Sequence, residues 1–215
     1  MENEVRNVLR DLYPFSKTNI NKRNQKKRFK DLLVTTNKDS LKIVIGSCQK
    51  FPGGWIPTEK HFLDLLRPEM WSKYFKKNTI NNLLAEHVWE HLTPEQGKIA
   101  AQTCYEFLKK GGRLRVAVPD GYHTDQNYIN YVKPGGIGLG ADDHKVLYNH
   151  ETFSSLFAEA GFEISLLEYF DNKGEFQAKV WDEKDGFIQR SIRHDERNQN
   201  GSPNYTSLIL DAIKK

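Results

Sequence analysis

An apolar run that ends at a glycine is the feature that most limits how this chain can fold. Residues 41–45 read Leu-Lys-Ile-Val-Ile, and Gly46 follows them directly. Such a run predicts a buried strand, and a glycine at its end lets the backbone approach a ligand because no Cβ intervenes. Glu59 stands at the end of a second, short predicted strand that begins near Trp55. A carboxylate there can accept hydrogen bonds from both hydroxyls of a ribose.

Strands and helices alternate along the rest of the chain, which favours a parallel α/β sheet. Thr93 and Gln96 form a capping box before Pro94, so a helix is predicted to start there, and its buried stripe should include Ile99, Cys104, Phe107 and Leu108. The predicted helices cover residues 94–110 and 150–160, and the further predicted strands cover residues 79–85, 113–120, 162–170 and 205–213. Between them we expect a long glycine-rich loop over residues 120–148 and a hairpin turn at residues 182–186.

The positive charge is concentrated at the N-terminal end. Residues 1–40 hold ten Lys or Arg and five Asp or Glu, whereas the whole chain has a net charge of +4. We therefore divide the chain into a basic N-terminal appendage, residues 1–40, with an amphipathic helix over residues 2–12, and an α/β domain, residues 41–215. The basic residues between Lys17 and Lys30 could contact nucleic acid or could form a solvated helix face.

Two further features of the sequence bear on where the protein acts. Its apolar runs are shorter than the roughly 18 residues that cross a bilayer, and the N-terminus lacks the basic-then-apolar order of a signal peptide. The two cysteines, Cys48 and Cys104, have no spacing typical of a disulfide framework or a zinc cluster. We expect a cytoplasmic protein that neither enters a membrane nor holds a metal.

The order of these motifs resembles the class I S-adenosylmethionine-dependent methyltransferases, in particular compact bacterial predicted methyltransferases. The resemblance runs from about Leu41 to the C-terminus and leaves the basic appendage unexplained. The stretches that carry it are residues 45–47, 54–56 with Glu59, 86–92, 108–114, 159–163 and 205–209. Of these, the Leu-Lys-Lys-Gly-Gly sequence that leads into an apolar strand is the most specific.

The resemblance implies a doubly wound, mostly parallel, Rossmann-like sheet of seven strands with helices on both faces and a reversed final strand. It also implies S-adenosylmethionine as cofactor, bound beyond the carboxyl ends of the strands. By the family pattern, the methionine and ribose would lie against Gly46, Ser47 and Cys48, the ribose diol against Glu59, and the adenine near Asp64 and Leu65. Glu86 and His87 would border the same crevice, with His87 facing the transferred methyl group.

Methyl transfer from a sulfonium needs few protein groups, because the electrophile is already activated. The enzyme aligns the acceptor, excludes water and, for a hydroxyl or amine acceptor, removes a proton. The candidate bases are His87, His123, His144 and Asp120, since imidazole titrates near neutrality and Asp120 ends a predicted strand. The acceptor is expected to be a small molecule or a saccharide precursor. The basic residues within 190–198 could clamp an anionic acceptor or could form a surface ion-pair network.

Three other functions fit parts of the sequence. Cys48 stands where such methyltransferases usually have a second glycine, which suits a binding protein that has lost its cofactor. The basic segment over residues 17–30 suits a nucleic-acid methyltransferase. Residues 87–91 read His-Val-Trp-Glu-His, which matches the H-x-x-E-H motif of zinc peptidases. That motif must lie within one continuous helix, and the capped helix that starts at Pro94 argues against it.

Overall fold

The computed structural model describes residues 17–47, 53–198 and 201–215. The helix predicted over residues 2–12 and the cofactor contact predicted for Cys48 lie outside these ranges. Within them, one seven-stranded sheet organises the molecule, in the order β2-β1-β3-β4-β7-β5-β6. The strands are β1 (Lys42–Ile45), β2 (Ile56–Pro57), β3 (Ile80–Glu86), β4 (Leu108–Pro119), β5 (Phe162–Phe170), β6 (Phe176–Ala178) and β7 (Ser207–Lys214).

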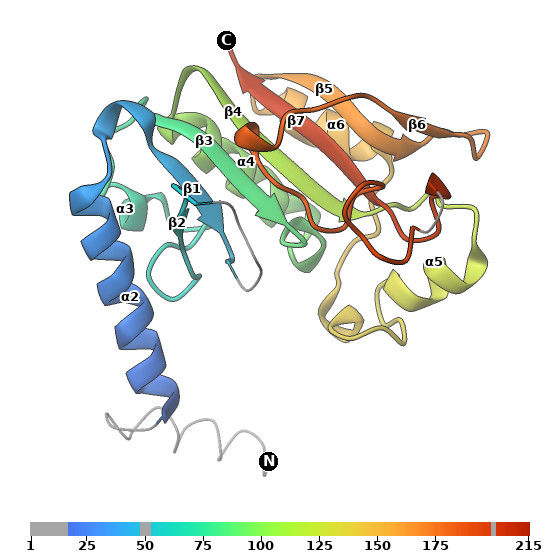
Figure 1. Ribbon diagram of the computed structural model, residues 1–215, viewed down its shortest axis with the longest axis horizontal. Coiled ribbons are helices and arrows are strands. Elements are labelled where there is room, and N and C mark those ends of the chain that lie inside the picture. The colour runs from blue at the N-terminus through green and yellow to red at the C-terminus, as the bar shows by residue number, and fades with distance from the viewer. Residues whose placement is uncertain (1–16, 48–52, 199–200) are drawn as a thin grey trace.

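The sheet confirms the predicted seven-stranded, mostly parallel arrangement with a reversed final strand. Strands β2, β1, β3 and β4 pair in parallel, whereas β7 runs antiparallel between β4 and β5 (Figure 1). Strand β6 adds an antiparallel edge to β5 that the sequence did not predict. Because β1, β3 and β4 are parallel, their carboxyl ends meet at one edge of the sheet, where α/β proteins bind ligands.

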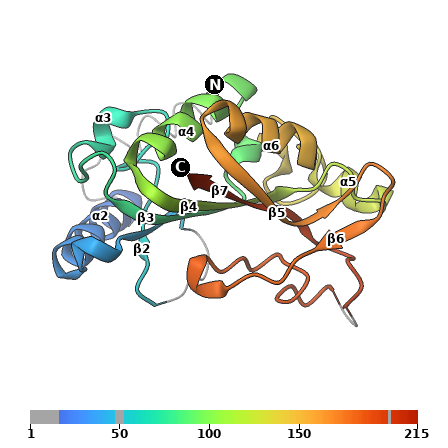
Figure 2. The same cartoon turned by 90° about the horizontal axis from the view of Figure 1, so that it is seen from above.

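Helices pack against one face of the sheet. They are α3 (Pro68–Trp71), α4 (Pro94–Phe107) and α6 (His150–Glu159), all drawn above the strands in Figure 2. The predicted capping box on α4 is present, with Thr93 Oγ1 accepting a hydrogen bond from the backbone N–H of Gln96. Cys104, Phe107 and Leu108 are buried as predicted. Ile99 differs, because 48% of its surface is exposed on the outer side of α4.

An irregular segment covers the central strands on the opposite face, where the resemblance implied helices. This covering segment comprises residues 179–198 and 201–206, and it runs below the sheet in Figure 2. Buried Trp181 and Ile188 pack with Val44, Leu84 and Ile209 of the strands. The predicted hairpin at residues 182–186 is a 3₁₀ turn, η4 (Glu183–Asp185), and the chain does not reverse there into a strand pair.

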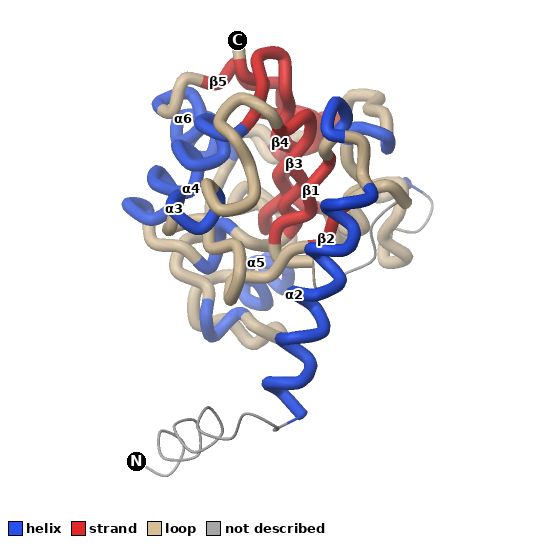
Figure 3. The backbone as a smooth tube through the Cα atoms, turned by 90° about the vertical axis from the view of Figure 1, so that its left-hand side faces the viewer, coloured by secondary structure: helices blue, strands red, loops and turns tan. Residues whose placement is uncertain are grey.

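The helix α2 (Lys17–Thr35) contains the whole basic segment, residues 17–30. Figure 3 shows it running past β2 and away from the sheet. Phe29 is fully buried and contacts Phe62 and Tyr74 at ring-centroid distances of 5.1 and 5.0 Å. The second half of α2 is therefore part of the main core, although it falls within the N-terminal appendage predicted from charge.

The predicted loop over residues 120–148 contains a helix, α5 (Gln126–Val132). Asp125 caps it, and its buried Tyr128 and Val132 are one turn apart. The 3₁₀ turns η1 (Lys38–Ser40), η2 (Trp89–His91) and η3 (Ala141–Asp143) lie in other connections. In the described part of the chain, no helix has both the length and the apolar composition needed to cross a membrane.

Candidate functional site

The turn after β1 brings the predicted glycine and carboxylate together. Gly46 has a φ of +64°, and a Cβ on it would lie 3.2 Å from Cγ2 of Val88. The next residue, Ser47, donates its backbone N–H to the carbonyl oxygen of Thr58 at 3.0 Å. The Ser47 hydroxyl also donates to Oε1 of Glu59 at 3.1 Å. The end of β1 and the carboxylate after β2 therefore lie at one point on the sheet edge.

A cavity of about 340 Å³ opens beside this turn, and we refer to it as cavity A. It is lined by Ile45, Gly46, Lys60, Leu63, Asp64, Leu65, His87, Val88, His91, Leu92 and Asp143. The carboxylate of Asp64 accepts the backbone N–H of Leu66 through Oδ1 at 2.9 Å. Mostly apolar walls with a few polar groups are typical of a small-ligand site. Gly46, Asp64, Leu65 and His87, which the sequence assigned to cofactor binding, all border this cavity.

His87 occupies a strained position directly after β3. Its φ is +55°, which is rare for a residue with a side chain and is frequent at functional sites. Its Nδ1 lies 2.6 Å from Oε1 of Glu90, and its Nε2 lies 3.1 Å from the hydroxyl of Ser207 on β7. Hydrogen bonds to both ring nitrogens therefore fix the orientation of the His87 ring.

Glu90 is fully buried beneath His87. Burial alone would raise its pKa, but the adjacent His87 charge and hydrogen bond outweigh that cost, so the pKa of Glu90 is lowered. Its second oxygen, Oε2, has no hydrogen-bond partner within the described residues. Buried carboxylate oxygens without a hydrogen-bond partner are uncommon in folded proteins.

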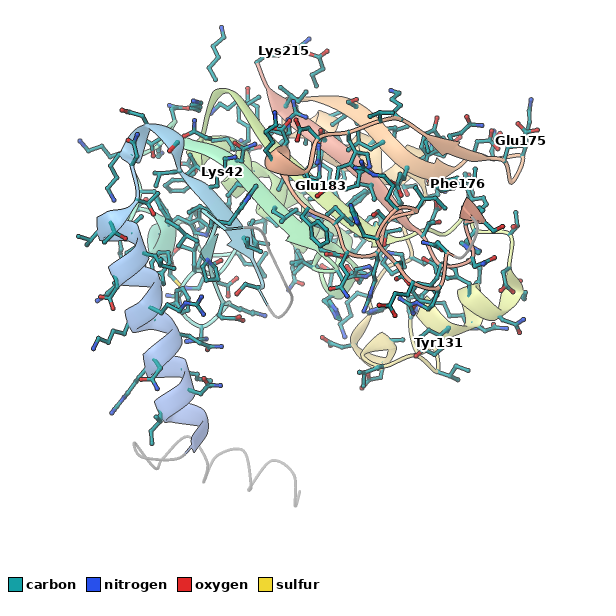
Figure 4. All side chains as sticks on the ribbon, in the orientation of Figure 1. Lys42, Tyr131, Glu175, Phe176, Glu183 and Lys215 are labelled. Carbon is teal, nitrogen blue, oxygen red and sulfur yellow. The ribbon has the colours of Figure 1, made fainter. Side chains whose placement is uncertain are left out.

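A second cavity of about 380 Å³, cavity B, adjoins cavity A at His87, which lines both. It is lined by Gly46, Glu86, His87, Glu90, His91, Pro119, Tyr131, Val132, residues 138–141, His144, Arg190, Arg197 and Tyr205. Tyr131, labelled in Figure 4, projects from α5 at the end of the molecule where β1, β3 and β4 terminate. Side chains from the long loop and from the covering segment therefore close one space over the strand ends.

Glu86 fixes the covering segment to the rim of cavity B. Its two carboxylate oxygens accept the backbone N–H groups of Gln189 and Arg190 at 3.1 and 2.7 Å. Arg197 stacks on the ring of Tyr205, with its guanidinium carbon 3.3 Å from the ring centroid, and pairs with Asp195. The sequence analysis assigned Glu86 to the cofactor. In the structure its carboxylate is instead bonded to the backbone that carries Arg190.

His144 enters cavity B from the long loop. Its Nδ1 lies 2.6 Å from the carbonyl oxygen of Val132, so Nδ1 donates and Nε2 is the ring nitrogen left to contact a ligand. The ring of His144 meets that of His91 edge to face, with centroids 4.8 Å apart. Glu90, His91 and His144 each offer one atom that could ligate a metal, and these atoms lie within 4.8 Å of one another.

Two of the predicted bases do not reach either cavity. Asp120 is buried, and its oxygens accept the backbone N–H groups of Tyr122 and Phe170 at 2.9 and 2.7 Å. Burial raises its pKa to about 6, yet its carboxylate does not line the site. His123 stacks on Tyr128 and is bonded through both ring nitrogens, and burial lowers its pKa. Both side chains instead hold the loop after β4.

The H-x-x-E-H residues do not form the helical zinc motif. Residues 87–91 leave β3 through a left-handed residue and the single 3₁₀ turn η2. His87 and His91 are therefore not neighbours on one α-helical face, and His87 is already bonded to Glu90 and Ser207. Sequence reasoning found these residues but missed that His144, 53 positions after His91, comes beside them, since no local pattern encodes that contact.

Several solved methyltransferase structures are similar to this architecture. A methyltransferase from Thermotoga maritima, described as dependent on S-adenosylmethionine, has a TM-score of 0.50 at 12% identity over 89% of both chains. The chain has the class I methyltransferase fold. Methyltransferases from Archaeoglobus fulgidus (TM-score 0.47, 16% identity, 88% of this chain and 94% of that one) and Mesorhizobium loti (0.48, 10%, 86% and 96%) are also similar. No family model and no curated protein matches the sequence.

Proposed function

We propose that this protein transfers a methyl group from S-adenosylmethionine to a small-molecule acceptor. One observation carries the proposal: cavities A and B share Gly46, His87 and His91 in their walls. Two ligands bound in these cavities would meet at His87, beyond the strand ends where proteins of this fold class bind ligands. Such an arrangement suits a transfer between two bound molecules, because it aligns them and excludes water.

The residues around cavity A fit the proposed cofactor. Gly46 offers backbone without a Cβ in the cavity wall. Glu59 is not among the lining residues, but it lies next to lining Lys60 and is bonded to Ser47, and we propose that its carboxylate accepts the hydroxyls of the ribose. Asp64 and Leu65 would lie beside the adenine. The bound cofactor supplies an activated methyl group, so the protein's own task is to hold that group at the boundary with cavity B.

Cavity B fits a small acceptor that carries negative charge. Its volume of about 380 Å³ lies within the range of small-molecule sites. Arg190 supplies a cationic group on its rim, and guanidinium groups bind carboxylates and phosphates well. The guanidinium of Arg197 is already paired with the carboxylate of Asp195. His144, whose Nδ1 is bonded to Val132 and whose Nε2 would take up the proton, is the base we propose for a hydroxyl or amine acceptor, and His87 orients the two ligands.

The test of cofactor binding is the Glu59→Ala variant. We expect calorimetric affinity for S-adenosylhomocysteine, the demethylated cofactor, to fall at least about tenfold, because loss of charged hydrogen bonds to a diol costs roughly 1.5–3 kcal/mol. Glu69→Ala is the matched control, since Glu69 is an exposed carboxylate that pairs with Arg67. Circular dichroism checks that both variants fold. Unchanged affinity in Glu59→Ala, or no binding by the parent protein, would argue strongly against the proposed function.

A nucleic-acid acceptor is the second candidate, and α2 supports it. Its basic side chains Lys22, Lys26, Lys27 and Lys30 are exposed on a helix that projects from the body (Figure 3). Phe29, the aromatic residue among them, is buried and cannot stack on a base. An RNA mobility shift that weakens with salt and with Lys22, Lys26 and Lys30 changed to Gln would favour this candidate.

A further inference from the structure

We propose that Glu90, His91 and His144 bind one divalent transition-metal ion at the base of cavity B. The three residues come from two separate parts of the chain, and one potential ligand atom from each lies within 4.8 Å of the other two. Ligands of one zinc ion, bound at 2.0–2.2 Å, lie about 3.4 Å apart. Binding therefore needs only a small closure of His91 and His144, which are both partly exposed.

The strongest support is the unpartnered oxygen of Glu90. The side chain of Glu90 is fully buried, His87 occupies Oε1, and Oε2 has no partner within the described residues. A buried carboxylate oxygen without a hydrogen bond destabilises the fold, because it has lost its water and gained nothing in return. A cation bound to Oε2 would remove that cost.

The surrounding hydrogen bonds already orient the ligands. His144 directs Nδ1 to the carbonyl of Val132, and metal-binding histidines commonly bond their second nitrogen to a carbonyl in this way. The carbonyl oxygen of Glu90 accepts the backbone N–H of Lys145 at 2.6 Å, which ties the two ligand-bearing segments together. His91 Nδ1 lies 3.3 Å from Oδ2 of Asp143, a further carboxylate at the edge of the cluster.

The ligand types indicate the class of metal. Two imidazoles and one carboxylate suit zinc, manganese, iron(II) or cobalt(II), whereas magnesium and calcium prefer sites made of oxygen. Three protein ligands leave coordination positions open towards cavity B. If the proposed methyl transfer is correct, an acceptor oxygen would bind there. With the ion present, Nε2 of His144 would be a ligand and no longer a base, and the metal itself would promote loss of the acceptor's proton.

This site differs from the zinc site that H-x-x-E-H would make. In that motif the two histidines bind the metal and the glutamate acts as a base. Here His87, the first histidine, bonds Glu90 and Ser207, and the glutamate itself is a proposed ligand. The second imidazole comes instead from His144.

Cobalt(II) is the probe for the test, used with untagged, chelator-treated full-length protein. We expect one bound ion per chain, detected by visible absorption, and retention of one zinc or manganese ion after dialysis, measured by elemental analysis. His144→Ala should weaken cobalt binding at least tenfold, and so should Glu90→Gln. His61→Ala is the matched control, because His61 is exposed and lies outside the cluster.

The outcomes separate this proposal from the proposed function. Less than one bound ion per chain in the parent protein, or equal cobalt affinity in the parent and His144→Ala, would overturn the metal site. His144→Ala changes a partly exposed residue, so it tests the site even if Glu90→Gln fails to fold. S-adenosylhomocysteine binding is measured separately on metal-free protein. A protein that binds cobalt but not S-adenosylhomocysteine would support the metal site and contradict the proposed methyl transfer.

Discussion

The two faces of the sheet are held by different kinds of interaction. On the helix face, aromatic side chains of α4, α6 and the loops pack into one apolar core that includes Trp89, Phe107 and Phe157. On the other face, a smaller apolar cluster is accompanied by buried charge. Arg115 is fully buried, pairs with Asp211 on β7, and donates to the carbonyl oxygens of Asp182 and Gly186 in the covering segment.

Glu168 on β5 also binds the covering segment to the sheet. Its two oxygens accept the indole N–H of Trp181 at 2.8 Å and the backbone N–H of Ile192 at 2.7 Å. Buried ion pairs add little net stability, but their geometry is specific. The helix face therefore supplies most of the stability, whereas the charged face fixes where the covering segment, with Arg190 and Arg197, lies over cavity B.

The largest expected effect is on the helix face. Phe157 lies 5.1–6.1 Å from the rings of Trp89, Phe153 and Phe162, so Phe157→Ala leaves a cavity among aromatic rings. We expect it to lower the free energy of unfolding by about 4 kcal/mol, measured by urea denaturation. Ile99→Ala, at the half-exposed position on α4, should cost under about 1 kcal/mol. Similar losses in both variants would contradict this assignment of the core.

The second effect tests the charged face. Asp211→Asn removes the charge that faces buried Arg115 and should lower the free energy of unfolding by about 3 kcal/mol. Limited proteolysis should cut the covering segment faster in this variant, while α4 and α6 stay protected. Asp185→Asn is the control, because Asp185 is a partly exposed partner of Arg113 and should change stability by less than about 1 kcal/mol. Equally fast cleavage of the covering segment and of α4 and α6 would contradict the proposal that the Arg115–Asp211 pair holds the covering segment in particular.

The smallest effect concerns a buried carboxylate that has no cationic partner in the described structure. The pKa of Asp120 is raised by burial from 3.8 to about 6. Below about pH 3 both the folded and the unfolded forms carry the proton, and as the pH rises towards 6 the unfolded form ionises first. Between about pH 4.5 and 6.5 this residue should therefore remove about 2 kcal/mol of stability.

Asp120→Asn isolates that contribution. The variant changes the level of stability at every pH, because an amide replaces one of two accepting oxygens, but it removes the titration. The measured quantity is the difference in unfolding free energy between parent and variant across the pH range. A difference that does not vary with pH would show that Asp120 ionises as easily in the folded state as in the unfolded chain.

Local sequence signals were sufficient for most of the framework. The β-branched run before Gly46, the capping box at Thr93 and the start of α6 after Asn149 each specify their element through neighbouring residues. The helix α5 was missed although Asp125 is a good cap with Tyr128 and Val132 one turn apart, because glycines nearby favoured a loop. Ile99 was misplaced because apolar character alone does not fix which side of a helix is buried.

The site was only partly predictable for a physical reason. Gly46 and Glu59 are brought together by adjacent strand ends, which the order of elements implies. The partner of Arg115 is Asp211, 96 positions later, and an isolated arginine in a strand looks like a solvent-facing residue. The covering segment has no periodic pattern, so its position depends on such distant pairs, and so does the lining of cavity B.

The central position of β7 has a consequence for synthesis on the ribosome. Strands β4 and β5 pair with β7 and not with each other, so both keep an unpaired edge until residues 207–214 emerge. Exposed edges of this kind recruit other strands and promote aggregation. A nascent chain that stalls shortly before residue 207 should therefore depend on chaperones, although six of the seven described strands are already made.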